Sequence, residues 1–221
     1  MNYELCISIR AMKYFVTGIG TDVGKSWATG WLAKRYMDEG KSVITQKFIQ
    51  TGNVGYSEDI EVHRQVMGIS KTQEDLEMIT APEIFNYPCS PDLAAKIDKR
   101  TIDFRKIESA TEILESRYDI VLIEGAGGVM VPLEGEYLTI DYIRDHRLPT
   151  IVVTNGQLGS INHTLLTLYA IKQYGIELAE VIYNHHFDKD PIICADTIEY
   201  LKRYLADHFP TTLFSEMNSI V

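Results

Sequence analysis

The stretch that decides the fold is "KYFVTGIGTDVGKS", Lys13–Ser26, in which an apolar run leads into a glycine-rich turn. The aromatic and β-branched residues of its first part, Lys13–Thr17, predict a buried strand. Apolar residues then recur at helical spacing, and a glycine that suits a helix end follows: Trp27, Ala28, Trp31, Leu32, Met37 and Gly40. A glycine turn between a strand and a helix N-terminus binds phosphate groups. This stretch therefore predicts a phosphate-binding loop.

The loop departs from the strict pattern for such sites. That pattern has a glycine separated by four residues from the Gly-Lys pair, and here the position is Ile19, flanked by Gly18 and Gly20. Lys25 would place its charge on the β- and γ-phosphates, and the Ser26 hydroxyl would coordinate Mg²⁺. The alternative is an ordinary turn whose lysine faces solvent, which the strand–turn–helix context disfavours.

Apolar runs and helical patterns alternate along the rest of the chain. Further strands are expected at Ser42–Phe48, Asp119–Glu124, Thr150–Thr154 and Leu178–Asn184. Helices are expected near Asp59–Met67, Asp103–Ser116, Ser160–Tyr174 and Ile192–His208. This alternation predicts an α/β fold of the P-loop NTPase type, with a mostly parallel central sheet and helices on both faces. Because no linker or repeat interrupts it, residues 1–221 are expected to form a single domain, with 1–11 as an extra strand or an extension before a start at Met12.

Three charged residues lie where the predicted strands end or a helix begins, so they are expected to meet at one edge of the sheet. Glu124, before the glycines of "EGAGG", suits Mg²⁺ coordination, or is a surface acid before a turn. Asp59 is a third magnesium ligand or a helix cap. Lys47 stabilises a transferring phosphoryl group or is an ordinary strand-end lysine.

Two polar stretches late in the chain are less specific. In "GQLGSINHT", Asn162 and His163 could serve a substrate, although capping of the following helix by Ser160 or Asn162 is equally consistent with the local sequence. The adjacent pair His185 and His186 lacks metal-ligand spacing to another cluster, and both are interpreted as polar residues at the protein surface.

The amino-acid composition disfavours some classes of binding partner. A formal charge of −10 argues against nucleic acid or an anionic membrane as the main partner. No apolar run approaches the roughly 18–20 residues that span a bilayer. The cysteines, Cys6, Cys89 and Cys194, are few and far apart, which suits a reducing cytoplasm. A cytoplasmic location without membrane attachment is expected.

Four motifs together resemble the dethiobiotin synthase family, the ATP-dependent cyclo-ligases of biotin biosynthesis. They are "YFVTGIGTDVGKS", "KFIQTG", "EGAGGVMVPL" and "LGSINHTLLT", in the family's order, and the resemblance runs from about Met12 to about Asn184. The family's own phosphate loop has the longer glycine spacing seen here, with Gly18 as its first glycine. The resemblance therefore implies a functional loop.

The resemblance implies that 7,8-diaminopelargonate and CO₂ form a carbamate whose oxygen attacks the γ-phosphate of MgATP. The second amine then closes the ureido ring and expels phosphate. Lys47 and Lys25 are the implied catalytic residues, and Ser26, Asp59 and Glu124 the implied Mg²⁺ ligands. The implied nucleotide-binding residues are Asp22, Val23, Gly24, Lys25, Ser26, Trp27, Asp59, Glu124, Gly125, Ala126, Gly127, Asn184 and His185. The implied substrate-binding residues are Thr21, Thr51 and Asn162, the last reaching across a homodimer interface.

Two features depart from the family. Phe48 follows the catalytic lysine where relatives usually have proline, so a different approach of Lys47 is expected. Relatives also continue past the position of Val221 into a segment that closes over adenine, so weak base selectivity is expected here, with Asn184 the main base contact.

Two alternative functions share this loop. A cobyrinate-type amidoligase needs a glutaminase domain, for which 221 residues are expected to leave no room. A partition or septum-site ATPase switch carries an additional lysine early in the loop, and Gly18–Val23 contains none.

Overall fold

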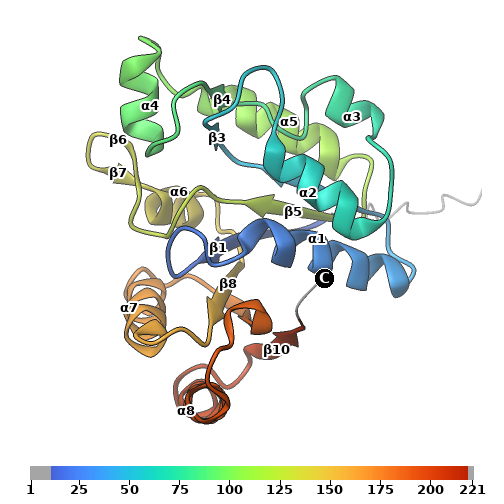
Figure 1. Cartoon of the computed structure of the whole chain (residues 1–221). Helices are drawn as coiled ribbons and strands as arrows, with labels where there is room; N and C mark the ends of the chain where they lie inside the picture. The colour runs from blue at the N-terminus through green and yellow to red at the C-terminus, as the bar shows by residue number, and fades with distance from the viewer. Residues whose placement is uncertain (1–10, 219–221) are drawn as a thin grey trace, which may run out of the picture.

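The computed structural model describes residues 11–218, so most of the expected N-terminal extension, residues 1–10, lies outside the described residues. Its centre is a six-stranded sheet in the order β10-β9-β8-β1-β5-β2, in which every neighbouring pair is parallel (Figure 1). The strands are β1 (Met12–Gly18), β2 (Val43–Lys47), β5 (Ile120–Glu124), β8 (Thr150–Asn155), β9 (Leu178–Asn184) and β10 (Leu213–Met217). The predicted parallel sheet is confirmed, and the first five of these strands match the expected runs within one residue or two.

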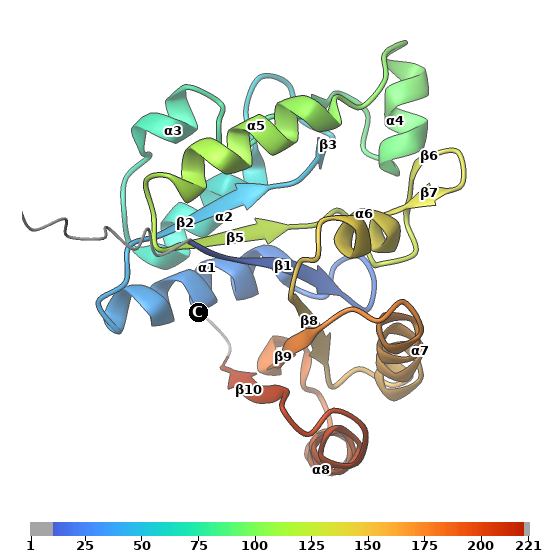
Figure 2. The ribbon, with the colours of Figure 1, turned by 180° about the vertical axis from the view of Figure 1, so that it is seen from behind.

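Helices cover both faces of the sheet, as predicted. Successive side chains of β5 alternate between two cores, with Ile120 and Leu122 in one and Val121 and Ile123 in the other. The first core is covered by α1 (Lys25–Asp38). The second core includes residues of α5 (Phe104–Glu115) and α7 (Ser160–Gln173), which Figure 2 shows on the other face of the sheet. The other long helices are α2 (Glu58–Met67) and α8 (Pro191–His208). The continuous apolar strands are thus explained by burial on both faces.

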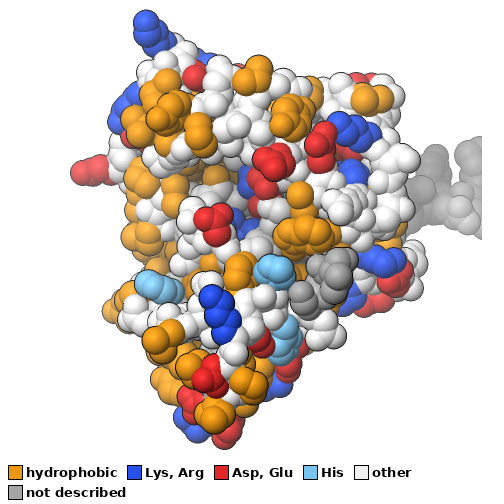
Figure 3. All heavy atoms as spheres, viewed as in Figure 1, with side chains coloured by type: hydrophobic (Ala, Val, Ile, Leu, Met, Phe, Trp, Pro, Cys, Tyr) orange, Lys and Arg blue, Asp and Glu red, His pale blue; other side chains and the backbone are white. Residues whose placement is uncertain are grey.

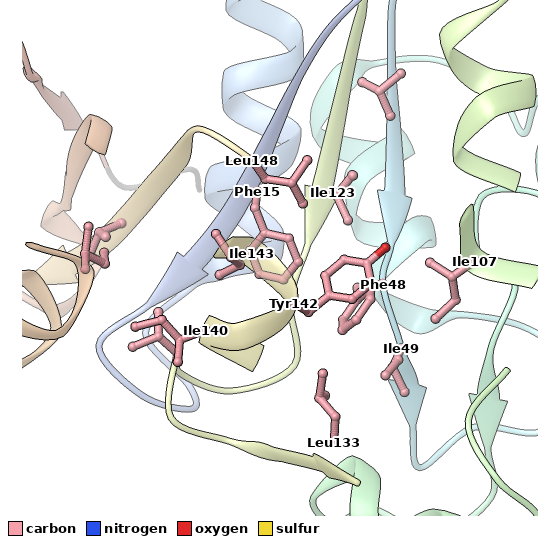
Figure 4. Close-up of a cluster of buried hydrophobic side chains, with 14 of the residues drawn as sticks. Phe15, Phe48, Ile49, Ile107, Ile123, Leu133, Ile140, Tyr142, Ile143 and Leu148 are labelled. Carbon is pink, nitrogen blue, oxygen red and sulfur yellow. The ribbon is translucent and has the colours of Figure 1, made fainter. Parts of the chain in front are cut away.

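An aromatic cluster fixes the end of β2. Phe48, fully buried, packs edge-on against Phe15 with ring centroids 5.5 Å apart and against Tyr142 at 4.5 Å (Figure 4). Such pairs add about 0.5–1.5 kcal/mol beyond their burial. The residue found in place of the family's usual proline therefore anchors the backbone immediately after Lys47.

Several short elements were not predicted from the sequence. They are β3 (Gln50–Thr51), α3 (Gln73–Leu76), β4 (Ile84–Phe85), α4 (Pro91–Ile97), β6 (Pro132–Glu134), β7 (Tyr137–Leu138), α6 (Thr139–Asp145) and a 3₁₀ turn, η1 (His185–Phe187). Strand β10 was also missed. None of the helices within residues 11–218 has the length and apolar character that crossing a membrane requires.

Candidate active site

The phosphate-loop motif forms a tight turn between β1 and α1. Gly24 precedes the helix with φ of 85°, a left-handed conformation that favours glycine, and a Cβ there would collide with the amide nitrogen of Asn184. Lys25 is the first residue of α1, and its Nζ donates to the carbonyl of Gly20 at 2.8 Å. The lysine side chain therefore lies back along the loop, where the helix N-terminus already favours anions.

Lys47 and Glu124 meet because their strands are in register. They are direct partners in the parallel pairing of β2 with β5, at the carboxyl end of both strands. The Lys47 Nζ lies 2.8 Å from Glu124 Oε1, 2.6 Å from Asp59 Oδ2 and 3.2 Å from the Gly125 carbonyl oxygen. Both Lys47 and Glu124 are buried. A single ammonium thus bridges the two carboxylates that the sequence singled out.

Ser26 contacts both carboxylates of this cluster. Its hydroxyl lies 2.5 Å from Asp59 Oδ1 and 3.0 Å from Glu124 Oε1. Asp59 lies in the first turn of α2. The N-cap of this helix is Ser57, whose hydroxyl accepts a hydrogen bond from the Ile60 N–H. The cap alternative for Asp59 is therefore not what the structure shows.

The charges of this cluster shift its pKa values in opposite directions. Burial alone would raise the pKa of Glu124, but the Lys47 ammonium and the hydrogen bond from His63 outweigh it and hold that pKa well below the usual range. Burial alone would lower the pKa of Lys47, but Glu124 and Asp59 raise it above its ordinary value. Burial and the charge of Lys47 lower the pKa of Lys25 to about 8. Glu124 and Lys47 are accordingly an ionised pair.

These residues line a cleft of about 690 Å³. Figure 3 looks onto it, with basic and acidic side chains meeting near the centre of the view. The predicted residues on its lining are Thr21, Asp22, Gly24, Lys25, Ser26, Trp27, Lys47, Thr51, Asp59, Glu124, Ala126, Gly127 and Asn184. The structure thus gathers most of the predicted site into one cavity at the carboxyl ends of the strands.

Four predicted residues lie apart from that lining. Val23 is buried behind the loop, where its carbonyl accepts from Asn184 Nδ2 at 3.1 Å. Gly125 contributes a carbonyl oxygen to Lys47. His185 lies between Asp188 and Glu216, at 2.7 and 3.0 Å, and the cleft is lined instead by its neighbour His186. Asn162 is exposed on the first turn of α7.

Sequence reasoning also missed residues of this region. His63, fully buried on α2, lies 2.5 Å from Glu124 Oε2. The signal was its position four residues after Asp59, which places both on one face of a helix. Phe187 and Met217 add apolar surface to the cleft beside Asn184. Met217 is the last residue of β10, and this strand lacks the continuous apolar run from which a strand can be predicted.

The donor set suits Mg²⁺. A hydroxyl and two carboxylates converge, which are the hard oxygen ligands that this ion takes. Within residues 11–218 no group of three or more His, Cys, Asp or Glu side chains forms a metal site of its own. Proteins usually hold Mg²⁺ by one or two carboxylates together with substrate phosphates.

Comparison with known proteins decides the family. A family model described as an AAA domain matches residues 12–216. An "ATP-dependent dethiobiotin synthetase BioD 2" of Pasteurella multocida is 50% identical over 210 residues, which cover 95% of this chain and 99% of the relative. This chain belongs to the dethiobiotin synthetase family. A dethiobiotin synthetase of Chlorobaculum tepidum is 46% identical over 193 residues, covering 86% of this chain and 81% of that relative.

Solved structures with low identity share the fold with this dethiobiotin synthetase family member. A ParA family ATPase from Chlorobium tepidum superposes with a TM-score of 0.54 at 16% identity, covering 96% of this chain and 86% of that one. The cell division protein FtsY from Thermotoga maritima gives 0.53 at 17% identity, covering 95% and 63%. Such likeness shows the fold alone. Membership of the dethiobiotin synthetases disfavours the partition-ATPase and amidoligase alternatives.

Proposed function

We propose that this protein is the ATP- and Mg²⁺-dependent cyclo-ligase that converts 7,8-diaminopelargonate and CO₂ into dethiobiotin, with release of ADP and phosphate. The observation that carries the proposal is the convergence of Lys25, Ser26, Lys47, Asp59 and Glu124 in one cleft. The ATP dependence and the reaction product are those that the relatives' names state. We place the reaction in the cytoplasm, without nucleic acid or membrane as a partner.

The reaction consists of carbamate formation, phosphoryl transfer and ring closure. One amine of the substrate adds to CO₂, and an oxygen of the resulting carbamate attacks the γ-phosphorus while ADP leaves. The second amine then attacks the activated carbonyl carbon, the ureido ring closes and phosphate departs. Such phosphoryl transfer needs positioning and charge neutralisation more than a protein nucleophile.

The residues of the cleft have separate roles in this proposal. Lys25, on the phosphate loop, turns from the Gly20 carbonyl to the β- and γ-phosphates. Lys47, held at the end of β2, neutralises the transferring phosphoryl group. Ser26, Asp59 and Glu124 would hold Mg²⁺, which would supply positive charge against the phosphate groups. Thr21 and Thr51, both on the cleft lining, contact the diamine or its carbamate.

Turnover tests the proposal directly. Purified protein is incubated with 7,8-diaminopelargonate, bicarbonate and MgATP, and dethiobiotin and phosphate are quantified by mass spectrometry and a phosphate assay. We expect one phosphate per dethiobiotin. Release of phosphate that does not depend on the diamine would contradict the assignment and favour an ATPase.

A homodimer is the second part of the proposal. Asn162, Leu166 and Tyr169 lie at helical spacing on one side of α7, and the last two are each 61% exposed. Leu158, 90% exposed in the preceding loop, extends this apolar surface. We propose that a second copy of the chain covers it and that Asn162 thereby reaches the carboxylate of the partner's substrate.

We expect Leu166→Asp to convert the dimer into monomers in sedimentation velocity, because it would bury a charge at the interface. Ile192→Asp, at a side chain that is 81% exposed on α8, is the matched control and should sediment like the wild type. Asn162→Ala should remain a dimer and raise the KM for diaminopelargonate about tenfold, the value of roughly one charge-assisted hydrogen bond. A fully active wild-type monomer would refute the shared site.

Base selectivity depends on Asn184 in this proposal. The orientation of its amide is fixed, because Nδ2 donates to the Val23 carbonyl and Oδ1 accepts from the His186 N–H at 3.0 Å. One donor and one acceptor capacity remain for a base. We expect ATP to be preferred over GTP in kcat/KM by no more than about 10–100-fold, about 1.4–2.7 kcal/mol. Equal use of the two, measured at fixed Mg²⁺, would exclude Asn184 as the reader of the base.

A further inference from the structure

A buried histidine lies behind Glu124 and takes no part in the steps above. His63 is 0% exposed, and its two ring nitrogens contact different strands of the sheet. Nε2 lies 2.5 Å from Glu124 Oε2, on β5, and Nδ1 lies 2.9 Å from the Thr45 hydroxyl, on β2. Since Glu124 uses its other oxygen, Oε1, toward Ser26 and Lys47, the two sides of the carboxylate have different partners.

The hydrogen-bond network assigns the proton of this histidine. Arg64 is held by Asp75 through two contacts of 2.7 and 2.8 Å, and its Nη1 donates to the Thr45 hydroxyl at 2.8 Å. A guanidinium can only donate, so the Thr45 oxygen accepts there, which leaves its own hydrogen able to point at Nδ1 of His63. An ionised carboxylate can only accept. Nε2 then carries the ring hydrogen and donates it to the ionised Glu124.

We propose that His63 is a positioning residue of the active site: by holding Oε2 of Glu124, it keeps Oε1 directed at the hydroxyl and ammonium groups of the reaction centre. This rests on the proposed role of Glu124 as a Mg²⁺ ligand. Glu124 is 1% exposed, so no bulk water can replace a lost donor on Oε2. Without His63, the carboxylate turns to satisfy both oxygens with Ser26 and Lys47, and the ligand oxygen is no longer presented.

Two amide variants test the proposal as a matched pair. The nitrogen of Gln corresponds to Nε2 of the histidine ring and can still donate to Glu124, whereas that of Asn corresponds to Nδ1 and reaches only Thr45. We expect His63→Asn to weaken binding of Mn²⁺, measured by electron paramagnetic resonance with a non-hydrolysable ATP analogue, about 10–100-fold. We expect His63→Gln to recover most of that affinity. In turnover, the Asn variant should lose kcat with little change in the KM for diaminopelargonate.

The outcomes separate positioning from simple support of the fold. Thermal unfolding of both variants gives the structural cost, which should be similar for the pair. Equal Mn²⁺ affinity in the wild type and His63→Asn would overturn the proposal, as would equal loss in both variants. Because Mn²⁺ binding needs no diaminopelargonate, a wild type that binds the metal–nucleotide but forms no dethiobiotin would refute the proposed function and not the role of His63.

Discussion

Lys47→Met should form dethiobiotin in a single turnover at least about 100-fold more slowly than the wild type, a loss comparable to removal of one preorganised charge-stabilising donor. Methionine keeps an apolar stem of similar length and removes the ammonium. Rapid quench of enzyme in excess over diaminopelargonate, at saturating MgATP, measures the chemical step without product release. A near wild-type rate would contradict the catalytic assignment.

The same variant leaves Asp59 and Glu124 without their shared cation, which bears on stability. Removing one partner of a buried pair costs about 3–5 kcal/mol, so the unfolding temperature in the absence of metal should fall. Added Mg²⁺ should raise it more in Lys47→Met than in the wild type, because the metal replaces the missing positive charge. Lys47→Arg, which keeps the charge, serves as the control for stability and should lack this extra response.

Lys25→Met should lower kcat/KM for ATP by about 100-fold or more, because the loop then lacks its positive charge for the β- and γ-phosphates. The loss should appear in the affinity for ATP as well as in the rate. Isothermal calorimetry with ATP and Mg²⁺, in parallel with steady-state kinetics, measures both. Lys34→Met removes an exposed lysine of the same helix, paired with Asp38, and should match the wild type; an equal effect of the two variants would indicate a general charge effect.

The pKa of Lys25, about 8, gives this prediction a pH dependence. Below pH 8 the side chain of the free protein is charged, and above it the neutral form must take up a proton before it can pair with phosphate. ATP affinity of the wild type should therefore decline as the pH rises above 8, by up to about tenfold per unit. Lys25→Met should not show this decline.

The sequence predicted the sheet and the loop because both depend on local signals. Continuous apolar runs identified β1, β2, β5, β8 and β9, and a glycine turn between strand and helix identified the phosphate loop. Short elements lack such signals. β3 and β4 have two residues each. β10 is an edge strand with one buried residue, and it has too little apolar continuity to be distinguished from a loop.

Parts of the candidate site depend on contacts between residues that are far apart in the sequence. The side chain of Phe48 lies in the core, and Lys47 is level with Glu124 in the paired strands. A different approach of Lys47 from that in relatives with proline stays a prediction. The buried contacts of His63 with Glu124 and Thr45 join residues 61 and 18 positions apart. At such sequence separations, no local pattern indicates which strand a helix will pack against. Helical spacing puts His63 on the same face of α2 as Asp59, but it does not indicate the contacts with Glu124 and Thr45.

The position of β1 within the sheet has a consequence for how the chain folds during synthesis. This strand leaves the ribosome first among the sheet's members, yet Met12 pairs with Ile120 and Phe15 with Thr150. Because translation adds about 5–20 residues per second, β1 and its glycine loop remain without the neighbouring strands for on the order of ten seconds. The hydrogen bond between the Val23 carbonyl and Asn184 can form only later, after Asn184 has been synthesised. Among the described residues, the phosphate loop is thus made before the strands that flank β1 and is completed only after they have been made. The unpaired β1 strand therefore needs protection from other chains during that interval.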